Sequence, residues 1–371
     1  MSRKGENIYK RKDKRWEARY IKGYDENGNA KYAYLYAKSY REVRERLERA
    51  KIQLASGAHI GSICKRKFCA YCDEWLQIHG SKIAASTYVK YFNTIEKHIK
   101  PVLGGLRAET ITTAVIARFS DGLLYEKGLS CKTVRDVLTI LSSILKYANK
   151  QIGARWQEIE IVYPKCESKE MRVLTRAEQE RLMAFLLTDM DAYKFGITLA
   201  LMTGMRIGEL CALRWKNVSL EERCIRIEAT MQRLMDMSDP IYNTKVVISS
   251  PKSERSTRMI PMTDAAVALC RRFYASSAEA FVLTGESTRF CEPRRLQYRF
   301  ARMMDQLDLQ GIHFHSLRHT FATRCVEVGF EIKSLSEILG HASPKITLER
   351  YVHSSFELKR NNMQKLCGVG L

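Results

Sequence analysis

The chain has 371 residues, a length that suggests two or three domains rather than one. Hydrophobic residues make up 45% of it, which is enough for real cores and excludes wholesale disorder. The 62 Lys and Arg against 41 Asp and Glu give a formal net charge of +21, which favours nucleic acid as a partner over a membrane surface or an acidic protein. The sequence has no apolar run of about twenty residues and begins with a charged segment, so we expect neither a membrane span nor a secretory signal.

Eleven cysteines are scattered along the chain, and without a secretory signal they predict free thiols in a reducing cytoplasm. The spacing of Cys64, Cys69 and Cys72 could suggest a zinc or iron–sulfur site. No fourth cysteine lies nearby, and the same segment has a helical repeat that predicts one buried face. That face would consist of Phe68, Cys72, Trp75, Leu76 and His79. We therefore favour a buried helix over a metal site.

Residues 1–60 contain 16 Lys and Arg against 8 Asp and Glu. Aromatic or apolar residues alternate with basic ones up to Tyr40, which predicts strands, and residues 25–29 predict a hairpin turn. A helix should follow from Tyr40 to about Leu54, capped by Ser39. The basic face of this sheet would fit a DNA groove, and an ordinary solvated face is the alternative. The candidate DNA contacts are Lys10, Arg11, Lys12, Lys14, Arg15 and Arg19.

The rest of the chain divides into a helical part, a linker and a mixed part. Residues 64–155 predict a four-helix domain, and residues 156–172 predict a linker because they combine Pro164 with a mixed polar run. A helix should begin near Thr175, with Glu178 completing a capping box. Strands are expected near 224–230, 244–249 and 258–262, among helices.

Two stretches place arginine and histidine at helix starts. In TGMRIGELCALRW, Arg206 begins an amphipathic helix, where backbone N–H groups favour an anion. In HFHSLRHTFATR, His315 and Arg318 lie three residues apart on one helical face. A proton carrier beside a bidentate phosphate binder suits phosphoryl transfer. Alone, Arg206 is a weak signal, because surface arginines at helix starts are common. The His315 and Arg318 pair alone could equally belong to an ordinary salt-bridged surface.

Two further stretches supply a histidine, a tyrosine and a lysine. In LGHASPKITLERYVH, His341 precedes a short helix that ends at Tyr351, a tyrosine that alone would be interpreted as core. In PKSERSTRMIPM, a polar turn precedes an apolar strand, which predicts a hairpin with Lys252 near its turn. A lysine in a turn is normally just solvated.

In this order and combination, the four stretches closely resemble the tyrosine recombinase family, which includes phage and conjugative-transposon integrases. The family pattern is T-G-x-R-x-x-E-L, a hairpin lysine, H-x-L-R-H, L-G-H and a tyrosine about ten residues further on. The matching residues are Arg206, Lys252, His315, Arg318, His341 and Tyr351. Lys245 lies on the same predicted hairpin and is the alternative to Lys252.

The resemblance implies a multidomain, mainly α fold with small β elements. Residues 1–60 would be an arm-type DNA-binding domain, built as a three-stranded sheet plus a helix. Residues 64–155 would be a helical core-binding (SAM-like) domain, followed by the linker at 156–172. Residues 173–371 would be a mixed α/β catalytic domain with a C-terminal tail. That tail, residues 356–371, would dock on a neighbouring subunit, with a frayed terminus as the alternative.

The resemblance also implies a site-specific DNA recombinase, an integrase that integrates and excises a mobile element. It would cleave and rejoin DNA through a 3′-phosphotyrosyl intermediate and a Holliday junction. Tyr351 would be the nucleophile, and Arg206 and Arg318 would hold the non-bridging oxygens of the phosphate.

The remaining roles in such a site concern protons. His315 would act as general base and later as acid, Lys252 would protonate the departing 5′ oxygen, and His341 would hydrogen-bond the phosphate. The phosphotyrosyl link stores the bond energy, so no metal, ATP or other cofactor is expected.

The implied partners are double-stranded DNA attachment sites, three further copies of the chain in a homotetramer, an excisionase and a host DNA-bending factor, with no membrane. The expected location is the bacterial cytoplasm, on DNA. A type IB topoisomerase-like relaxing enzyme and a non-catalytic DNA-binding regulator are the alternatives. The basic N-terminal segment argues against the first, and the presence of all six catalytic residue types argues against the second.

Overall fold

The computed structural model divides into two compact units, residues 1–166 and 167–371. In the part of the chain that the structure describes, helices dominate and three small sheets are present, which confirms the expected mainly α, multidomain class. The structure describes residues 7–24, 30–55, 66–152, 159–167, 172–239, 243–250 and 257–351. No helix in these ranges is both long and apolar enough to cross a membrane.

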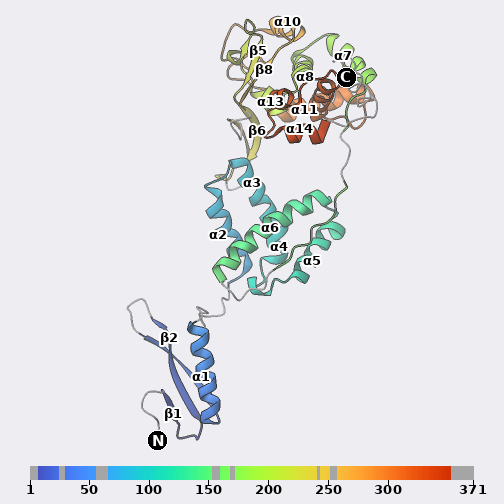
Figure 1. Ribbon diagram of the computed structural model, residues 1–371. Coiled ribbons are helices and arrows are strands. Elements are labelled where there is room, and N and C mark those ends of the chain that lie inside the picture. Colours follow the sequence, from blue (N-terminus) through green and yellow to red (C-terminus); the bar gives the residue numbers. More distant parts are fainter. Residues whose placement is uncertain are drawn as a thin grey trace, which may run out of the picture. The chain divides into compact units, whose positions relative to one another are not determined.

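The first unit opens with an antiparallel three-stranded sheet in the order β1-β2-β3, and a helix, α1, lies along one face of it (Figure 1). The inner face, including Ala18 and Tyr20, packs on Val43 and Leu47 of α1. Ser39 accepts a hydrogen bond from a backbone N–H of α1, so the predicted cap is confirmed. The predicted turn at 25–29 lies outside the described residues. The bounds are β1 Ile8–Lys10, β2 Trp16–Tyr24, β3 Ala30–Ala37 and α1 Tyr40–Ala55.

Four helical stretches follow, as the sequence predicts. Two of them contain a π-helical turn, at Ile95–Ile99 between α3 and α4 and at Gly122–Glu126 after α5. Phe68, Cys72, Trp75 and Leu76 form the predicted buried face of α2, whereas His79 is only half-buried and stacks on Trp75. Among the described residues no cluster could hold a metal, and Cys64 lies outside them. The helices are α2 Phe68–Gly80, α3 Ala85–Thr94, α4 Lys100–Leu103, α5 Thr113–Asp121 and α6 Cys131–Ile152.

The expectation that the cysteines are all free thiols is wrong for one pair. Cys131, the first residue of α6, forms a disulfide with Cys166. Residues 159–167 return along the helical part, where Ile159 and Ile161 contact its core. This return brings two cysteines that are 35 residues apart in the sequence to a Cα–Cα distance of 5.6 Å. The spacing of the cysteines in the sequence does not predict this pair.

The second unit has a buried central helix, α8, which contacts α7, α10, α11 and α12. Eight of its twelve residues are buried, because the helix is apolar on nearly all sides. The helix α7 begins with the predicted capping box of Thr175 and Glu178. The helices are α7 Arg176–Leu187, α8 Ala192–Thr203, α9 Ile207–Ala212, α10 Asp264–Phe273, α11 Pro293–Gln306, α12 Phe314–Glu327, α13 Ile332–Leu339 and α14 Pro344–Tyr351.

The strands of this unit lie near the predicted positions but pair differently. The predicted hairpin joins residues 244–249 to 258–262, whereas β7 pairs with β6, and β8 pairs with β5 in the order β4-β5-β8. Burial explains the difference, because Ile260 of β8 lies opposite Ile225 in the core while β7 has no fully buried residue. The strands are β4 Val218–Ser219, β5 Cys224–Ile227, β6 Thr230–Met235, β7 Thr244–Ser249 and β8 Arg258–Pro261.

Candidate active site

The start of α9, the start of α12 and the turn between α13 and α14 meet around one open hollow of about 300 Å³. Its lining includes three arginines and two histidines but no carboxylate, so the hollow suits an anion. The lining residues are Arg206, His315, Arg318, Gly340, His341, Ala342, Ile346 and Arg350.

Two glycines in the left-handed conformation place these segments. Gly204 ends α8 with a φ of 66° and is followed, after Met205, by Arg206, the N-cap of α9. Gly340 ends α13 with a φ of 64° and leads directly to His341. A Cβ at Gly204 would lie 2.5 Å from the ring of Phe321, so a side chain there would be both strained and crowded.

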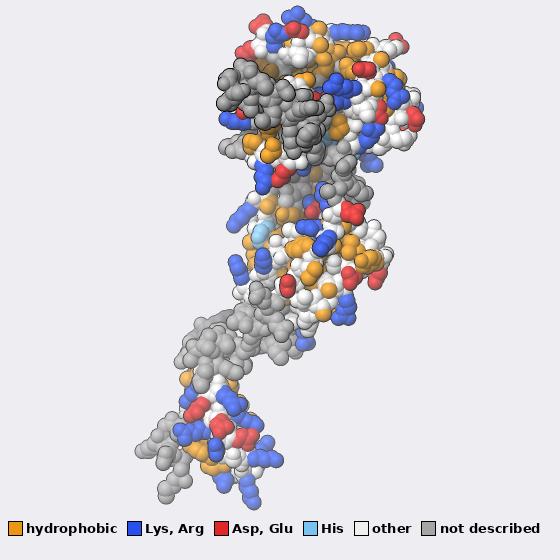
Figure 2. All heavy atoms as spheres, turned by 45° about the vertical axis from the view of Figure 1, so that its right-hand side comes forward, with side chains coloured by type: hydrophobic (Ala, Val, Ile, Leu, Met, Phe, Trp, Pro, Cys, Tyr) orange, Lys and Arg blue, Asp and Glu red, His pale blue; other side chains and the backbone are white. Residues whose placement is uncertain are grey.

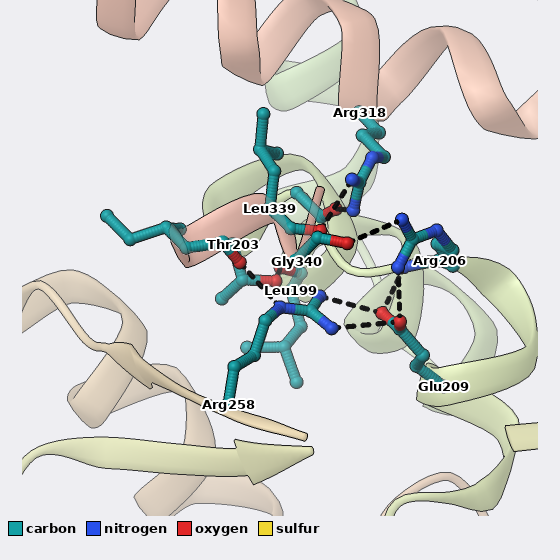
Figure 3. Close-up of polar contacts among 10 residues, drawn as sticks. Leu199, Thr203, Arg206, Glu209, Arg258, Arg318, Leu339 and Gly340 are labelled. Atoms are coloured by element: carbon teal, nitrogen blue, oxygen red, sulfur yellow. Dashed lines mark hydrogen bonds and ion pairs between the residues drawn. The ribbon is translucent and has the colours of Figure 1, made fainter. Parts of the chain in front are cut away.

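Arg318 is buried below the hollow, with only 2% of its surface exposed. It donates hydrogen bonds to the carbonyls of Gly204 (3.0 Å) and Leu339 (2.6 Å), at the ends of α8 and α13 (Figure 3). Burial and the nearby Arg206 lower the pKa of its guanidinium to about 9, so it remains charged at neutral pH. A buried positive charge bonded to carbonyls gains from a bound anion.

Arg206 is half-buried and is held at two points (Figure 3). Its Nη1 donates to Glu209 (2.8 Å), and its Nη2 donates to the Gly340 carbonyl (3.2 Å). Glu209 also accepts two hydrogen bonds from Arg258, at 2.9 and 2.8 Å. Burial disfavours the Glu209 carboxylate, but the bonds from Arg258 outweigh it and lower the pKa to about 2.

Sequence reasoning did not identify Glu209 or Arg258. Glu209 could have been found, because it is the glutamate of the T-G-x-R-x-x-E-L pattern, three residues after Arg206. Arg258 gives no such signal, because its partner Glu209 is 49 residues away in the sequence.

Tyr351 ends α14 with 5% of its surface exposed. Its hydroxyl lies 2.8 Å from Nδ1 of His319, a buried residue of α12 that the sequence analysis also missed. The ring of His341 lies parallel to the tyrosine ring at 6.3 Å between centroids. Burial raises the pKa of the Tyr351 phenol, so it is protonated at neutral pH. The structure thus brings together five of the six predicted residues, although the hydrogen-bond partner of Tyr351 is His319 and not His315.

The three histidines of the site share one electrostatic environment. Burial is the main cause that lowers the pKa values of all three. The next cause is Arg318 for His315 and His341, and His315 for His319. The pKa is about 4 for His315 and His319 and about 3 for His341. All three are therefore neutral at pH 7 and can accept a proton.

The lysine of the predicted site, Lys252, lies outside the described residues. Its alternative, Lys245, is on β7 and forms an exposed ion pair with Asp236 at 3.1 Å. Lys245 does not line the hollow.

The six basic residues predicted to contact DNA lie on β1, on β2 and in the turn between them. Basic side chains are prominent on the N-terminal sheet and helix, with acidic ones between them (Figure 2). Arg19 stacks on the exposed Tyr32 at 4.5 Å, and Arg11 and Arg15 approach Tyr36 at 5.5 and 5.9 Å. Five are exposed and Arg19 is half-buried: Lys10, Arg11, Lys12, Lys14, Arg15 and Arg19.

Curated proteins similar to this chain include a recombinase, an integrase and a transposase. A protein named tyrosine recombinase XerC-like, from Caldanaerobacter subterraneus, is 24% identical over 93% of both chains. The ICEBs1 integrase of Bacillus subtilis is 26% identical over 70% of this chain and 71% of its own. The transposase of transposon Tn916 from Enterococcus faecalis is 31% identical over 52% of each chain.

Solved structures share the fold. The Tn1549 transposon integrase in complex with transposon right end DNA has a TM-score of 0.69 at 22% identity, covering 81% of this chain and 99% of that one. A lambda integrase tetramer bound to a Holliday junction has a TM-score of 0.56 at 19% identity, covering 95% and 97%.

The family comparison agrees with the geometry of the site. Residues 67–124 match the N-terminal SAM-like domain of phage integrases. Residues 172–357, half of the chain, match the Phage integrase family and include the whole hollow and Tyr351. The chain therefore belongs to the phage integrase family of tyrosine recombinases.

Proposed function

We propose that this site-specific recombinase cleaves DNA by attack of the Tyr351 hydroxyl on a backbone phosphate. The observation that carries the proposal is a buried tyrosine beside a hollow lined by Arg206, Arg318 and two histidines. The new bond joins the tyrosine oxygen to phosphorus, and the bond to the 5′ oxygen breaks. The phenol loses its proton and the 5′ oxygen gains one. Attack by a 5′ hydroxyl on the 3′-phosphotyrosyl link reverses these changes and reseals a strand.

Arg206 and Arg318 bind the non-bridging oxygens in this proposal and stabilise the charge that builds up at phosphorus. His341 hydrogen-bonds the phosphate. The arrangement supports these roles, because all three line the same hollow and no carboxylate lines it.

Two histidines take different positions in the proton transfers. His315 lines the hollow and serves as the acid–base group at the phosphate. His319 is the hydrogen-bond partner of the Tyr351 hydroxyl, a role that the 2.8 Å distance supports. Lys252 remains the proposed donor to the departing 5′ oxygen, on the strength of its place in the family pattern.

The proposed division of labour follows the chain. Residues 1–60 bind arm-type DNA sites, residues 64–155 bind the core site, residues 156–172 link them to the catalytic domain, and residues 173–371 catalyse exchange and end in the tail. The net charge of +21 and the arginine–tyrosine stacks of the N-terminal sheet support DNA contacts.

At the level of the assembly, four copies would exchange strands on two duplexes through a Holliday junction, to integrate and excise a mobile element. The lambda integrase, which forms a tetramer on such a junction, supports this stoichiometry. The cytoplasm as location, and an excisionase and a host DNA-bending factor as further partners, complete the proposal.

Covalent capture tests the nucleophile. The full-length protein is incubated with sheared DNA from the cell of origin, denatured, and the DNA that stays attached is sequenced. Wild-type protein should retain one specific sequence, which then serves as a defined substrate. Tyr351→Phe should yield no adduct on that substrate while its affinity for it stays within about threefold. A denaturation-resistant adduct on the Phe variant would rule out Tyr351.

A further inference from the structure

Arg258 is an arginine of β8 that is almost completely buried, with 5% of its side chain exposed, and it does not line the hollow. Its Nη1 and Nη2 each donate to one carboxylate oxygen of Glu209, at 2.9 and 2.8 Å. Its Nε donates to the Ile338 carbonyl at 2.6 Å. One guanidinium therefore binds both α9 and the end of α13 (Figure 3).

Those two points are also the anchors of Arg206. The same Glu209 carboxylate accepts from Arg206 Nη1 (2.8 Å) and from the Arg206 backbone N–H (2.9 Å). The other Arg206 contact is the carbonyl of Gly340, two residues after Ile338. Arg258 thus binds, from the protein interior, the Glu209 carboxylate and the end of α13, and these two groups hold Arg206.

The charges give Arg258 a second effect. Arg206, Glu209 and Arg258 carry a net charge of one positive unit, and the least buried of the three is Arg206. Removing Arg258 would leave the buried Glu209 carboxylate with Arg206 as its ion-pair partner. A buried carboxylate binds such a partner strongly, so Arg206 would neutralise Glu209 instead of facing a phosphate.

We propose that Arg258 is a positioning residue for recombination, which holds and neutralises Glu209 so that Arg206 keeps its place and its charge for the phosphate. The inference rests on the proposed role of Arg206. It assigns no contact with DNA to Arg258 itself.

The matched control is Arg324 of α12, which makes the same kind of bonds away from the hollow. It donates to Gln179 (3.0 Å), to Glu327 (2.7 Å) and to the Leu174 carbonyl (2.7 Å). Arg258→Met and Arg324→Met each remove an arginine that donates to a glutamate and to a backbone carbonyl, so both should lower the melting temperature. The two variants differ in one respect: Arg258 shares Glu209 with Arg206, whereas Arg324 binds Gln179, Glu327 and Leu174.

The first measurement is the single-turnover rate of covalent adduct formation with saturating amounts of the captured DNA site. Arg258→Met should lower this rate by about 10- to 100-fold with little change in DNA affinity, as expected for a displaced catalytic arginine. Arg324→Met should leave it within about twofold of wild type. Arg258→Lys keeps the charge but not the two-point grip on Glu209, so its rate should be intermediate.

The second measurement separates positioning of Arg206 from general damage to the domain. A methylphosphonate at the cleavage point carries no negative charge and so needs less help from Arg206. The rate deficits of Arg258→Met and Arg206→Ala should therefore both shrink on this substrate. General damage to the fold would lower the rate of a variant by the same factor on both substrates, so its deficit relative to wild type would be the same on each.

Several outcomes overturn the inference. One is a wild-type rate in folded Arg258→Met, and another is a deficit that is the same on both substrates. If Arg258→Met does not fold, Arg258→Lys carries the test, and a wild-type rate in it has the same meaning. If wild-type protein forms no adduct at Tyr351, the proposed function fails first and the inference fails with it.

Discussion

The proposed nucleophile, Tyr351, and its hydrogen-bond partner His319 are buried, and His319 lies one turn along α12 from His315, which lines the hollow. His319 bonds the Tyr351 hydroxyl, while His315 lies 4.4 Å from the His319 ring and lines the hollow. Because burial and nearby charges keep both imidazoles neutral, each can accept a proton without first losing one. The two histidines are therefore distinguishable by substitution.

His319→Ala should slow covalent adduct formation by about 10- to 100-fold, because the phenol loses its hydrogen-bond partner. DNA affinity should stay near wild type, since His319 does not line the hollow. Single-turnover cleavage and a filter-binding titration measure the two effects. A His319→Ala variant that cleaves at the wild-type rate would leave His315 as the base.

The buried histidines also make stability depend on pH. His319 and His341 have pKa values of about 4 and about 3 in the folded protein, below the value of about 6.5 expected when unfolded. Between those values the unfolded chain binds more protons, so the free energy of unfolding should fall as pH drops from about 6.5 to about 4. Urea unfolding at about pH 7.5 and about pH 5 measures the loss, which should be smaller in the variant His319→Gln/His341→Gln. An equal loss in that variant would contradict the assignment.

At this scale the motifs predicted most of the charged residues that line the hollow, whereas the buried partners Glu209, Arg258 and His319 were not assigned a role. Arg206, Arg318 and His341 were predicted and lie together. Arg258 was missed because its bonds to Ile338 and Glu209 span 80 and 49 residues. Such partners are set by tertiary packing and leave no local pattern.

The elements of the catalytic unit are joined at glycines whose backbone conformation other residues rarely adopt. Gly340 matters most, because it ends α13, supplies a carbonyl to Arg206 and lies against Arg258. A Cβ at this position would lie 2.9 Å from Cδ of Arg258, in addition to the cost of a positive φ.

Gly340→Ala should destabilise the protein by more than the roughly 1–2 kcal/mol typical of a left-handed residue, because the new methyl group also displaces Arg258. Gly311→Ala is the control, since Gly311 has a φ of 73° and a Cβ added there would meet no described atom within 4 Å. Thermal unfolding of both variants compares the two costs. If both variants lose the same amount of stability, the contact between the added methyl group and Arg258 does not contribute to the cost.

Helices were predicted more accurately than strand partners. The capping box of α7 and the cap of α1 are local signals, and both are confirmed. The pairing of β7 with β6 and of β8 with β5 depends on which residues enter the core, so the predicted hairpin was wrong. The Cys131–Cys166 disulfide was missed for the same reason.

At the scale of the whole molecule, the chain combines a basic N-terminal sheet with a catalytic unit that holds the hollow. The family was predicted correctly from four motifs, and the mainly α class that the resemblance implies is also confirmed. The DNA-binding roles of residues 1–60 and 64–155 remain predictions.

Deletion of residues 1–60 should abolish a second, salt-sensitive DNA contact while the remainder still forms the covalent adduct on the core site. Basic residues that bind phosphates release counterions, so the salt dependence of the affinity should become weaker in the truncated protein. Titration of a long and a short DNA duplex at several salt concentrations measures this. Unchanged affinity for the long duplex at every salt concentration would refute the arm-binding role.

The most direct test of the central claim is to locate the covalent bond. The wild-type adduct is digested with nuclease and protease, and the peptide that retains a nucleotide is sequenced by mass spectrometry. The account predicts a nucleotide attached through its 3′ phosphate to the hydroxyl of Tyr351. A nucleotide on any other residue, or attached through its 5′ phosphate, would contradict it.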